Sequence, residues 1–353
     1  MAFKIGNKLI GNSEKIFFIA EAGVNHNGSV DYGMKLIDIA VKAGADAVKF
    51  QTFKAESLNT LNAPKSTYHV ETTGTDEDQS WFDLLKSQEI SVDMHKKLIN
   101  YCNQKKIIFL STPYDEESAD LLDNLNVAAF KIASTDTNNL RFLDYVARKK
   151  RPMIISTAMC SIDEVTEAVD TIKSAGLKEL VVLQCTGNYP SKIEDSNLSV
   201  INKYKELYKI PVGYSDHTME SINPILAVGL GISVYEKHYT IDRNMPGPDH
   251  RMSLDPEELI NTISILRKAE KSIGNNNKKI LEDEIENRNK LRKSIVAREN
   301  ISKGQVIDNS MLIMKRPGTG IQPRDVKLIV GSKAKQNINR DALIDFNMLD
   351  LKK

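Results

Sequence analysis

The sequence predicts a (β/α)₈ TIM barrel over roughly residues 17–272, followed by a small β-rich domain. Three observations lead to this prediction. Short apolar runs alternate with longer segments of helical periodicity, as parallel strands and their crossover helices do. There are eight such runs, the number that closes a barrel, and the chain of 353 residues exceeds the usual length of one hydrophobic core. Because an open, doubly wound sheet would show the same alternation, the prediction depends on the count of eight.

The eight predicted strands are short and almost entirely apolar, because strands of a parallel sheet are buried on both faces. In chain order they are Phe17–Ala20, Ala47–Phe50, Ile107–Leu110, Ala128–Ile132, Met153–Ile155, Leu180–Leu183, Pro211–Tyr214 and Ser233–Glu236. The helical segments between and after them include Tyr32–Ala43, Val92–Gln104, Ile162–Ala175 and Pro256–Ser272. A short hairpin is expected ahead of the first strand.

Two segments interrupt the alternation. The connection from Thr52 to Ile90 is too long for a plain crossover, so we expect a functional lid or a mobile loop there. After Ser272, a glycine and three asparagines are followed by a charged, helix-prone run that is typical of a linker. We therefore predict a barrel domain over 1–272, a linker over 273–292 and a compact domain over 293–353.

Composition excludes several classes of function. The 48 lysines and arginines nearly balance the 47 aspartates and glutamates, so the formal net charge of +1 gives no overall field to attract nucleic acid or an anionic membrane. The apolar run Ile16–Ala20 is far too short to span a bilayer. The three cysteines are an odd number without metal-ligand spacing, which indicates reduced thiols in a cytoplasmic protein.

Polar residues follow every predicted strand, at the end where (β/α)₈ barrels place their active sites. His217 and His238 end neighbouring strands, so their imidazoles can converge on one divalent ion, with Mn²⁺ or a similar ion suiting two histidines. Alternatively, each histidine caps its strand by bonding to the backbone. The remaining histidines are expected to be mostly structural or at the surface: His26, His69, His95 and His250. Of these, His26 in the first loop and His250 after the last strand are also placed to line the pocket.

Two lysines at strand ends predict a cationic site for a phosphate. Lys49 and Lys131 supply charge, and nearby hydroxyls supply donors: Ser134, Ser156 and Ser215. One lysine alone would be expected to extend into solvent, but two lysines ringed by serines favour an anion. Glu21 and Glu236 can orient a substrate group or transfer a proton. Either of them can instead form an ion pair with one of the lysines.

Two further candidates lie outside the strands. Asp249, in the loop after the last strand, is free to contact a polyol, and it precedes a helix start in which Asp255 is the cap and Pro256 the first residue. In the small domain, Arg316 lies on a rigid turn. From there it can reach a ligand only if that domain folds over a barrel mouth.

Taken together, the strand-end motifs form an ordered set that spans nearly the whole chain. They are Ile19–Gly23 with Asn25–Gly28, Val48–Gln51, Lys131–Ser134, Ile155–Thr157, Cys185–Thr186 with Tyr189–Pro190, Gly213–Thr218, Glu236–His238, Gly247–Asp249 and Lys315–Gly318. In these motifs the chain resembles the sialic acid (N-acetylneuraminate) synthases, which condense phosphoenolpyruvate with an N-acetylated mannosamine-type sugar. The last motif falls in what resembles their antifreeze-like (SAF) domain.

The resemblance implies a role for each candidate residue. Phosphoenolpyruvate would be held by Lys49, Lys131, Ser134, Ser156 and Ser215. The acceptor sugar would be held by Gln51, Thr112, Tyr189, Glu236 and Asp249. His217 and His238 would bind the metal that activates the open-chain aldehyde, with Mg²⁺ or Co²⁺ as alternatives to Mn²⁺. Arg316 would come from the partner subunit, because the small domain caps the barrel of the other chain in a swapped homodimer of this family.

The reaction implied joins C3 of the enol to the sugar aldehyde, adds water at C2 and releases phosphate, with Glu21 positioning the reacting atoms or moving a proton. The acceptor expected first is N-acetylmannosamine, giving N-acetylneuraminate. Gly187 stands where synthases for that product commonly have Asn, so a 2,4-diacetamido-2,4,6-trideoxyhexose leading to legionaminic or pseudaminic acid is the alternative. Less favoured are another metal-dependent aldolase or 3-deoxy sugar-acid synthase, and a non-catalytic carbohydrate-binding scaffold.

Overall fold

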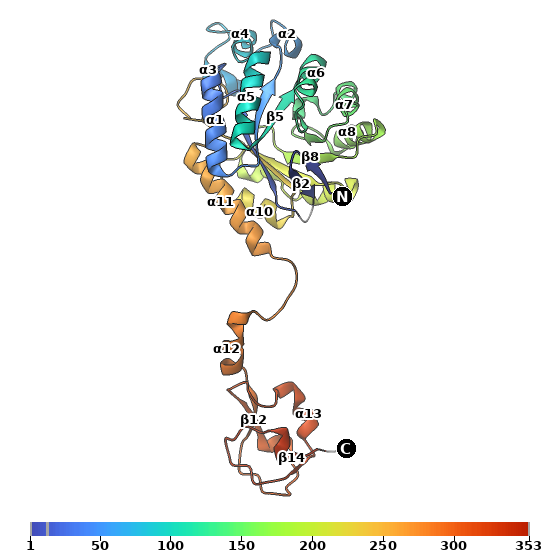
Figure 1. Ribbon diagram of the computed structural model, residues 1–353, viewed down its shortest axis with the longest axis vertical. Helices are drawn as coiled ribbons and strands as arrows, with labels where there is room; N and C mark the ends of the chain where they lie inside the picture. The colour runs from blue at the N-terminus through green and yellow to red at the C-terminus, as the bar shows by residue number, and fades with distance from the viewer. Residues whose placement is uncertain (1, 12–13, 352–353) are drawn as a thin grey trace. The chain divides into compact units, whose positions relative to one another are not determined.

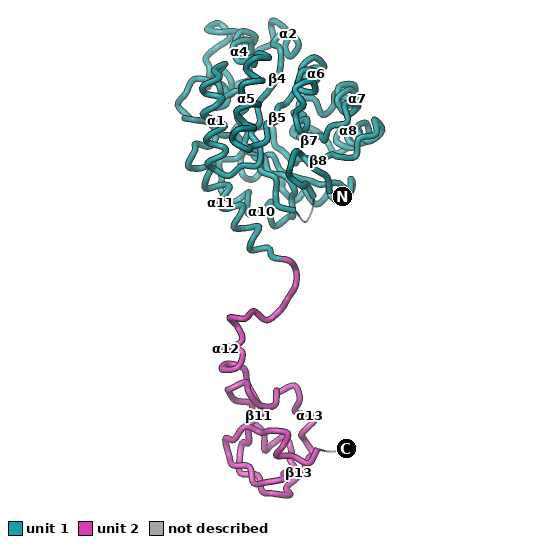
Figure 2. The backbone as a smooth tube through the Cα atoms, viewed as in Figure 1, with its two compact units in different colours: residues 1–274 teal, residues 275–353 magenta. Residues whose placement is uncertain are grey.

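The computed structural model describes residues 2–11 and 14–351, so the outermost residues of the predicted domain ranges lie outside the described residues. The chain divides into two compact units, residues 1–274 and 275–353 (Figure 2). Within the described ranges, no helix combines the length and the apolar character that crossing a membrane would require.

The first unit is a closed barrel of eight parallel strands surrounded by helices (Figure 1), which confirms the predicted fold class. Neighbouring strands follow one another in sequence, and the last pairs with the first to close the barrel. The barrel strands are β3 (Phe17–Gly23), β4 (Ala47–Thr52), β5 (Ile108–Pro113), β6 (Phe130–Ile132), β7 (Met153–Ser156), β8 (Leu180–Cys185), β9 (Val212–Asp216) and β10 (Val234–His238).

The helices between the strands bury one apolar face each against the outside of the barrel. They are α1 (Val30–Ala43), α5 (Val92–Lys105), α6 (Glu116–Asn124), α7 (Leu140–Ala147), α8 (Ile162–Ser174), α9 (Val200–Tyr208), α10 (Asn223–Gly229) and α11 (Pro256–Ile273). Asp255 caps α11 through the backbone N–H of Glu258, with Pro256 as the first helical residue, so the predicted helix start is confirmed.

Inside the barrel, alternate residues of each strand point inward, so the interior is built in layers. The lower layers are apolar and include Phe17, Ile19, Leu110, Ile154 and Leu183. The antiparallel hairpin of β1 (Ala2–Ile5) and β2 (Lys8–Gly11) buries Phe3, Ile5 and Ile10 in the same cluster. The hairpin therefore closes the amino-terminal end of the barrel with apolar side chains.

The long connection after β4 folds into three short helices: α2 (Ala55–Leu58), α3 (Thr67–Thr73) and α4 (Trp81–Ser87). Ser66 and Ser80 cap α3 and α4 by accepting backbone N–H bonds. Phe53, Ala55 and Leu85 form a small separate core with Val24 of the first barrel loop. This segment, hereafter the insertion (residues 53–90), is thus packed onto the barrel.

The second unit has its own apolar core, which includes Ile295, Ile307, Ile338 and Ile344. Its elements are α12 (Glu282–Leu291), β11 (Ser294–Ala297), β12 (Leu312–Lys315), α13 (Val326–Ile329), β13 (Lys333–Ala334) and β14 (Leu349–Asp350). Helix α12 occupies most of the segment predicted to be a linker. Its side chains are exposed, as its charged composition indicates.

Candidate active site

A polar layer lies directly above the apolar layers of the barrel. Each strand contributes one side chain to it, two positions after an inward-facing residue of the layer below: Glu21, Lys49, Thr112, Lys131, Ser156, Cys185, Ser215 and Glu236. All of them line a cavity of about 640 Å³. The strand period of two residues therefore brings side chains from distant parts of the chain into one ring.

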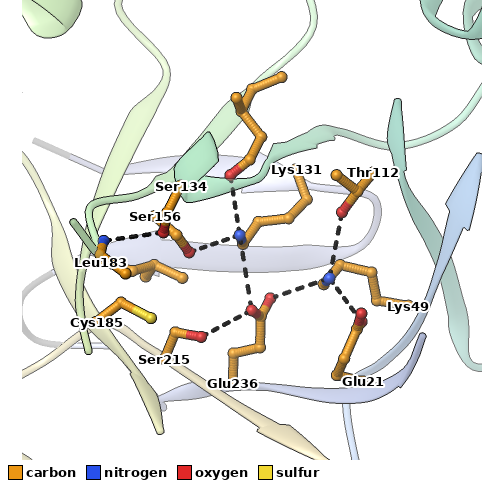
Figure 3. A network of polar contacts seen from close by, with 12 residues as sticks. Glu21, Lys49, Thr112, Lys131, Ser134, Ser156, Leu183, Cys185, Ser215 and Glu236 are labelled. Carbon is orange, nitrogen blue, oxygen red and sulfur yellow. Dashed lines mark hydrogen bonds and ion pairs between the residues drawn. The ribbon is translucent and has the colours of Figure 1, made fainter. Parts of the chain in front are cut away.

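Four of these side chains carry charge and point toward one another (Figure 3). Lys49 Nζ lies 2.6 Å from Glu21 Oε2 and 3.7 Å from Glu236 Oε2, while Lys131 Nζ lies 3.6 Å from Glu236 Oε1. Each charge is almost completely buried. Both glutamates therefore form ion pairs with the lysines, as one of the two predicted alternatives requires.

Neutral side chains complete the contacts of these charges. Lys49 Nζ donates to Thr112 Oγ1 at 3.2 Å, and Lys131 Nζ donates to Ser156 Oγ at 2.6 Å. Ser215 Oγ donates to Glu236 Oε1 at 3.0 Å. A buried ion is tolerated only where such partners compensate for its lost hydration, so the ring is held in a defined geometry.

The two glutamates differ in acidity although they share Lys49. Burial raises the pKa of Glu21 to about 7, against the opposing charge of Lys49. Burial also acts to raise the pKa of Glu236, but the charges of Lys131 and Lys49 outweigh it and hold that pKa below its usual value. Glu21 is consequently the group of this ring that can exchange a proton near neutral pH.

His217 and His238 lie at the ends of β9 and β10 with ring centroids 5.4 Å apart. His217 Nδ1 donates to the carbonyl of Thr186 at 2.7 Å, as the strand-capping alternative requires, and this leaves Nε2 as a lone-pair donor for a metal. His238 Nδ1 is buried without a hydrogen-bond partner in the described chain. Burial lowers the pKa of His217 to about 4 and that of His238 well below its usual value, so both rings are neutral.

Neutral imidazoles with a free nitrogen are the form that binds a divalent ion, so this pair fits a metal. Within the residues that the structure describes, no group of three or more His, Cys, Asp or Glu side chains is placed to hold one. A metal bound here would therefore take its remaining ligands from water or substrate oxygens.

Two predicted sugar-binding residues, Gln51 and Tyr189, contact Glu21 and His217. Gln51 Nε2 donates to Glu21 Oε1 at 3.3 Å. The ring of Tyr189 packs on that of His217 with centroids 4.3 Å apart. Both side chains line the cavity.

The other predicted residues of the barrel line the same cavity. Ser134 Oγ accepts the backbone N–H of Ala158 at 2.9 Å. Burial raises the pKa of Asp249 to about 6. Arg316 belongs to the second unit, so its contribution to this site stays a prediction.

Three histidines lie elsewhere than the sequence predicts. His26 and His250 do not line the cavity; both are buried, and His250 bonds to Thr240 and Asn27. His69 was expected to be structural or at the surface, but it lines the cavity from α3. Tyr68 and Trp81 of the insertion line it as well. The aromatic residues Tyr68, His69, Trp81 and Phe82, which stand in an otherwise polar stretch, are a sequence signal that could have indicated this.

A closed (β/α)₈ barrel with charged and polar groups at the carboxyl ends of its strands defines a barrel enzyme. The NeuB family matches residues 36–278, and the SAF domain family matches residues 292–350. The chain belongs to the NeuB family and carries a SAF domain, which confirms the resemblance to sialic acid synthases.

Individual relatives match over almost their full length. The chain is 43% identical to the N,N'-diacetyllegionaminic acid synthase of Legionella pneumophila, over 95% of this chain and 94% of the relative. It is 34% identical to the N-acetylneuraminate-9-phosphate synthase of Homo sapiens, over 97% and 94%. The crystal structure of the spore coat polysaccharide biosynthesis protein SpsE of Bacillus subtilis matches 100% of both chains, with a TM-score of 0.68 and 38% identity. These relatives support a nonulosonic acid synthase that acts on small-molecule substrates.

Proposed function

We propose that this chain condenses phosphoenolpyruvate with a 2,4-diacetamido-2,4,6-trideoxyhexose to give a legionaminic-type acid and phosphate. The observation that carries the proposal is the buried ring of two lysines and two glutamates beneath two neutral histidines. For the acceptor, support comes from the higher identity to the Legionella pneumophila synthase, 43%, than to the human one, 34%. N-acetylmannosamine, the acceptor first expected from the sequence, is the alternative.

The position of Gly187 supports the same acceptor. A Cβ atom at Gly187 would lie 3.0 Å from Cγ of Met159, whose side chain lines the cavity. An asparagine at this position would therefore require the exposed Met159 side chain to shift. Through Met159, the residue at position 187 would change the shape of the cavity wall.

We assign the phosphoenolpyruvate site to the two lysines and to the hydroxyls near them: Lys49, Lys131, Ser134, Ser156 and Ser215. Lys131 is fixed by Ser156 and faces Glu236. Lys49 is held most closely by Glu21. Protonation of Glu21 removes that counter-charge, so an anionic substrate is favoured when Glu21 is neutral.

We assign the divalent ion, Mn²⁺ first, to His217 and His238. When bound, it would polarise the carbonyl of the open-chain aldehyde. We assign the acceptor to Gln51, Thr112, Tyr189, Glu236 and Asp249, with Arg316 supplied by a second copy of the chain. The pairing of Tyr189 with His217 would put the sugar beside the two histidines.

In the proposed reaction, C3 of the enol forms a bond to the aldehyde carbon. Water then adds at C2, and cleavage of the C–O bond to the phosphoryl group releases phosphate. Glu21, with its pKa raised to about 7, is the group assigned to move a proton in these steps. Its contact with Gln51 would hold the carboxyl in position.

Incubation with phosphoenolpyruvate, Mn²⁺ and a panel of acetamido sugars, read by product mass, tests this proposal. The diacetamido sugar should give a product with release of phosphate. Glu21→Gln and Lys131→Ala should abolish phosphate release. Turnover of N-acetylmannosamine alone would contradict the acceptor, and no turnover of any sugar would contradict the reaction.

The metal assignment has a separate test. His217→Asn should weaken Mn²⁺ binding, measured directly by calorimetry, by about tenfold or more. The matched control is His95→Asn, because His95 is buried but does not line the cavity. Equal Mn²⁺ affinity in both variants would remove His217 from the metal site.

A further inference from the structure

A row of aromatic rings runs along the cavity from the two histidines to the insertion. Tyr189 lies 4.3 Å from His217 and 6.4 Å from Tyr68, measured between ring centroids. Tyr68 lies 5.7 Å from His69, and His69 stacks on Trp81 at 4.3 Å with an interplanar angle of 19°. All of these rings line the cavity. The far end of the row is thus formed by α3 and α4, over one end of the barrel (Figure 1).

The insertion holds these rings through contacts on several sides. Leu85 and Ala55 are buried in its small core. Glu89 accepts the backbone N–H of Ala55 at 2.9 Å and pairs with Lys54 at 2.8 Å. Lys65, buried, donates to the carbonyl of Gly74 at 2.9 Å. Because these contacts fix the backbone around α3 and α4, the aromatic surface exists before a ligand arrives.

The hydroxyl of Tyr68 is available for a ligand. It is buried, the backbone N–H of Met252 faces its oxygen, and no group in the part of the chain that the structure describes accepts its proton. Burial raises the pKa of Tyr68 above its ordinary value, so the hydroxyl keeps its proton. A buried hydroxyl whose proton has no acceptor is unfavourable, and an amide carbonyl of a ligand would accept that proton.

We propose that Tyr68, His69 and Trp81 form a subsite that recognises the distal half of the acceptor, at its C4 and C6 substituents. This inference rests on the proposed function. If the aldehyde carbon lies at His217 and His238, carbons farther along the sugar lie farther along the aromatic row. There the ring faces contact a methyl at C6 and the methyl of an acetamido group at C4, while Tyr68 donates to the acetamido carbonyl.

The subsite explains how one barrel can discriminate between acceptors. N-acetylmannosamine carries hydroxyls at C4 and C6, which gain little from aromatic faces and would lose hydration there. A diacetamido-trideoxy sugar presents two methyl groups and a carbonyl instead. Discrimination by an apolar subsite is about tenfold or more for each such group.

Competition between the two acceptors tests the subsite. In Trp81→Leu and in the conservative Tyr68→Phe, the ratio of kcat/KM for the diacetamido sugar over N-acetylmannosamine should fall by about tenfold. The KM for phosphoenolpyruvate should stay unchanged. Phe82→Leu is the matched control, because Phe82 is the next residue on α4, packs in the core of the insertion and does not line the cavity.

An unchanged ratio in both variants, or an equal fall in Phe82→Leu, would overturn the subsite. Failure of the proposed function is distinguishable, since it would appear as a wild-type protein that turns over no sugar of the panel. A wild type that prefers N-acetylmannosamine would contradict the proposed acceptor, and a ratio unaffected by the variants would then contradict the subsite separately.

Fluorescence gives a readout that does not need turnover, because Trp81 is the single tryptophan of the sequence. The emission of Glu21→Gln protein with Mn²⁺ and phosphoenolpyruvate should change saturably on titration with the diacetamido sugar. Adding Tyr68→Phe should shift that titration to about tenfold higher sugar concentration. Unchanged emission at concentrations that saturate the active wild type would also overturn the subsite.

Discussion

Lys49 lies between two glutamates, and this sharing determines the chemistry of both. Among the described residues, Glu236 has two lysines within 4 Å, whereas Glu21 has one, which it shares with Glu236. The pKa of Glu21 is therefore raised, and the pKa of Glu236, which shares Lys49 with it, is lowered. Opposite shifts in neighbouring titratable groups are typical of acid and base assignments in active sites.

The raised pKa of Glu21 predicts how stability depends on pH. An unfolded glutamate ionises near 4.5, while buried Glu21 keeps its proton up to about pH 7, so the free energy of unfolding falls as the pH rises through this window. Glu21→Gln should remove this pH dependence, which lowers the free energy of unfolding by on the order of 3 kcal/mol between the two pKa values. Urea unfolding at a series of pH values measures it.

Glu236→Gln is the matched control for this prediction. The pKa of Glu236 is lowered, so its contribution to stability is present at neutral pH and is lost as the pH falls through the folded pKa. The two variants should therefore change the pH profile in opposite directions. Profiles that change in the same direction would contradict the assignment.

The sequence was sufficient to predict the charged strand-end residues that line the cavity but not how they pair. Strand ends of a parallel barrel meet at one face, so Lys49, Lys131, Glu21 and Glu236 had to lie near one another. Which carboxylate faces which lysine depends on side-chain geometry across the barrel, and no spacing along the chain encodes it. The sequence is therefore compatible with more than one pairing of these four side chains.

At the scale of elements, the eight strands were predictable because each is a short apolar run bounded by polar residues, such as Leu180–Cys185. The helices of the insertion were not. Helices α2 to α4 are four to seven residues long, too short for a helical period to be recognised. Helices α3 and α4 begin at serine caps, and the insertion packs in a core shared with Val24. The position of His69 depends on these tertiary contacts, so the sequence pattern did not predict it.

A buried ion pair outside the ring ties β9 to β10. Lys237 Nζ lies 2.9 Å from Asp216 Oδ2, and both side chains are buried on the helix-facing side of the strands. Lys237→Met should destabilise the protein by about 3 kcal/mol in urea unfolding, because it leaves the buried Asp216 carboxylate without its counter-charge and with only the hydrogen bonds from Tyr235 and Thr218. The double variant with Asp216→Leu should recover part of that loss. A double variant with the summed loss of both single variants would show that the pair is not coupled.

At the scale of the whole molecule, the chain consists of a barrel unit and a SAF domain that each have a hydrophobic core. The expected swapped homodimer makes a prediction about mixed subunits. In such a dimer, the barrel of one chain is completed by Arg316 of the other. Two variants that are each inactive can then complement one another.

Glu21→Gln and Arg316→Ala should each lose turnover of phosphoenolpyruvate and sugar. Co-refolded in equal amounts, they should recover about a quarter of wild-type activity, because half of the dimers are mixed and each mixed dimer has one intact site of two. Two preparations of Glu21→Gln treated in the same way are the control. Absence of recovery, with mixed dimers verified by mass, would exclude the swap.

The hairpin of β1 and β2 closes the barrel below the charged ring with Phe3, Ile5 and Ile10. Small molecules must then arrive and depart through the strand-end opening, on the side of the insertion. A molecule bound to Lys131 at the depth of the ring would have to enter before, and leave after, a molecule bound along Tyr189 and Trp81. The closed amino-terminal end of the barrel would therefore impose an order on substrate binding.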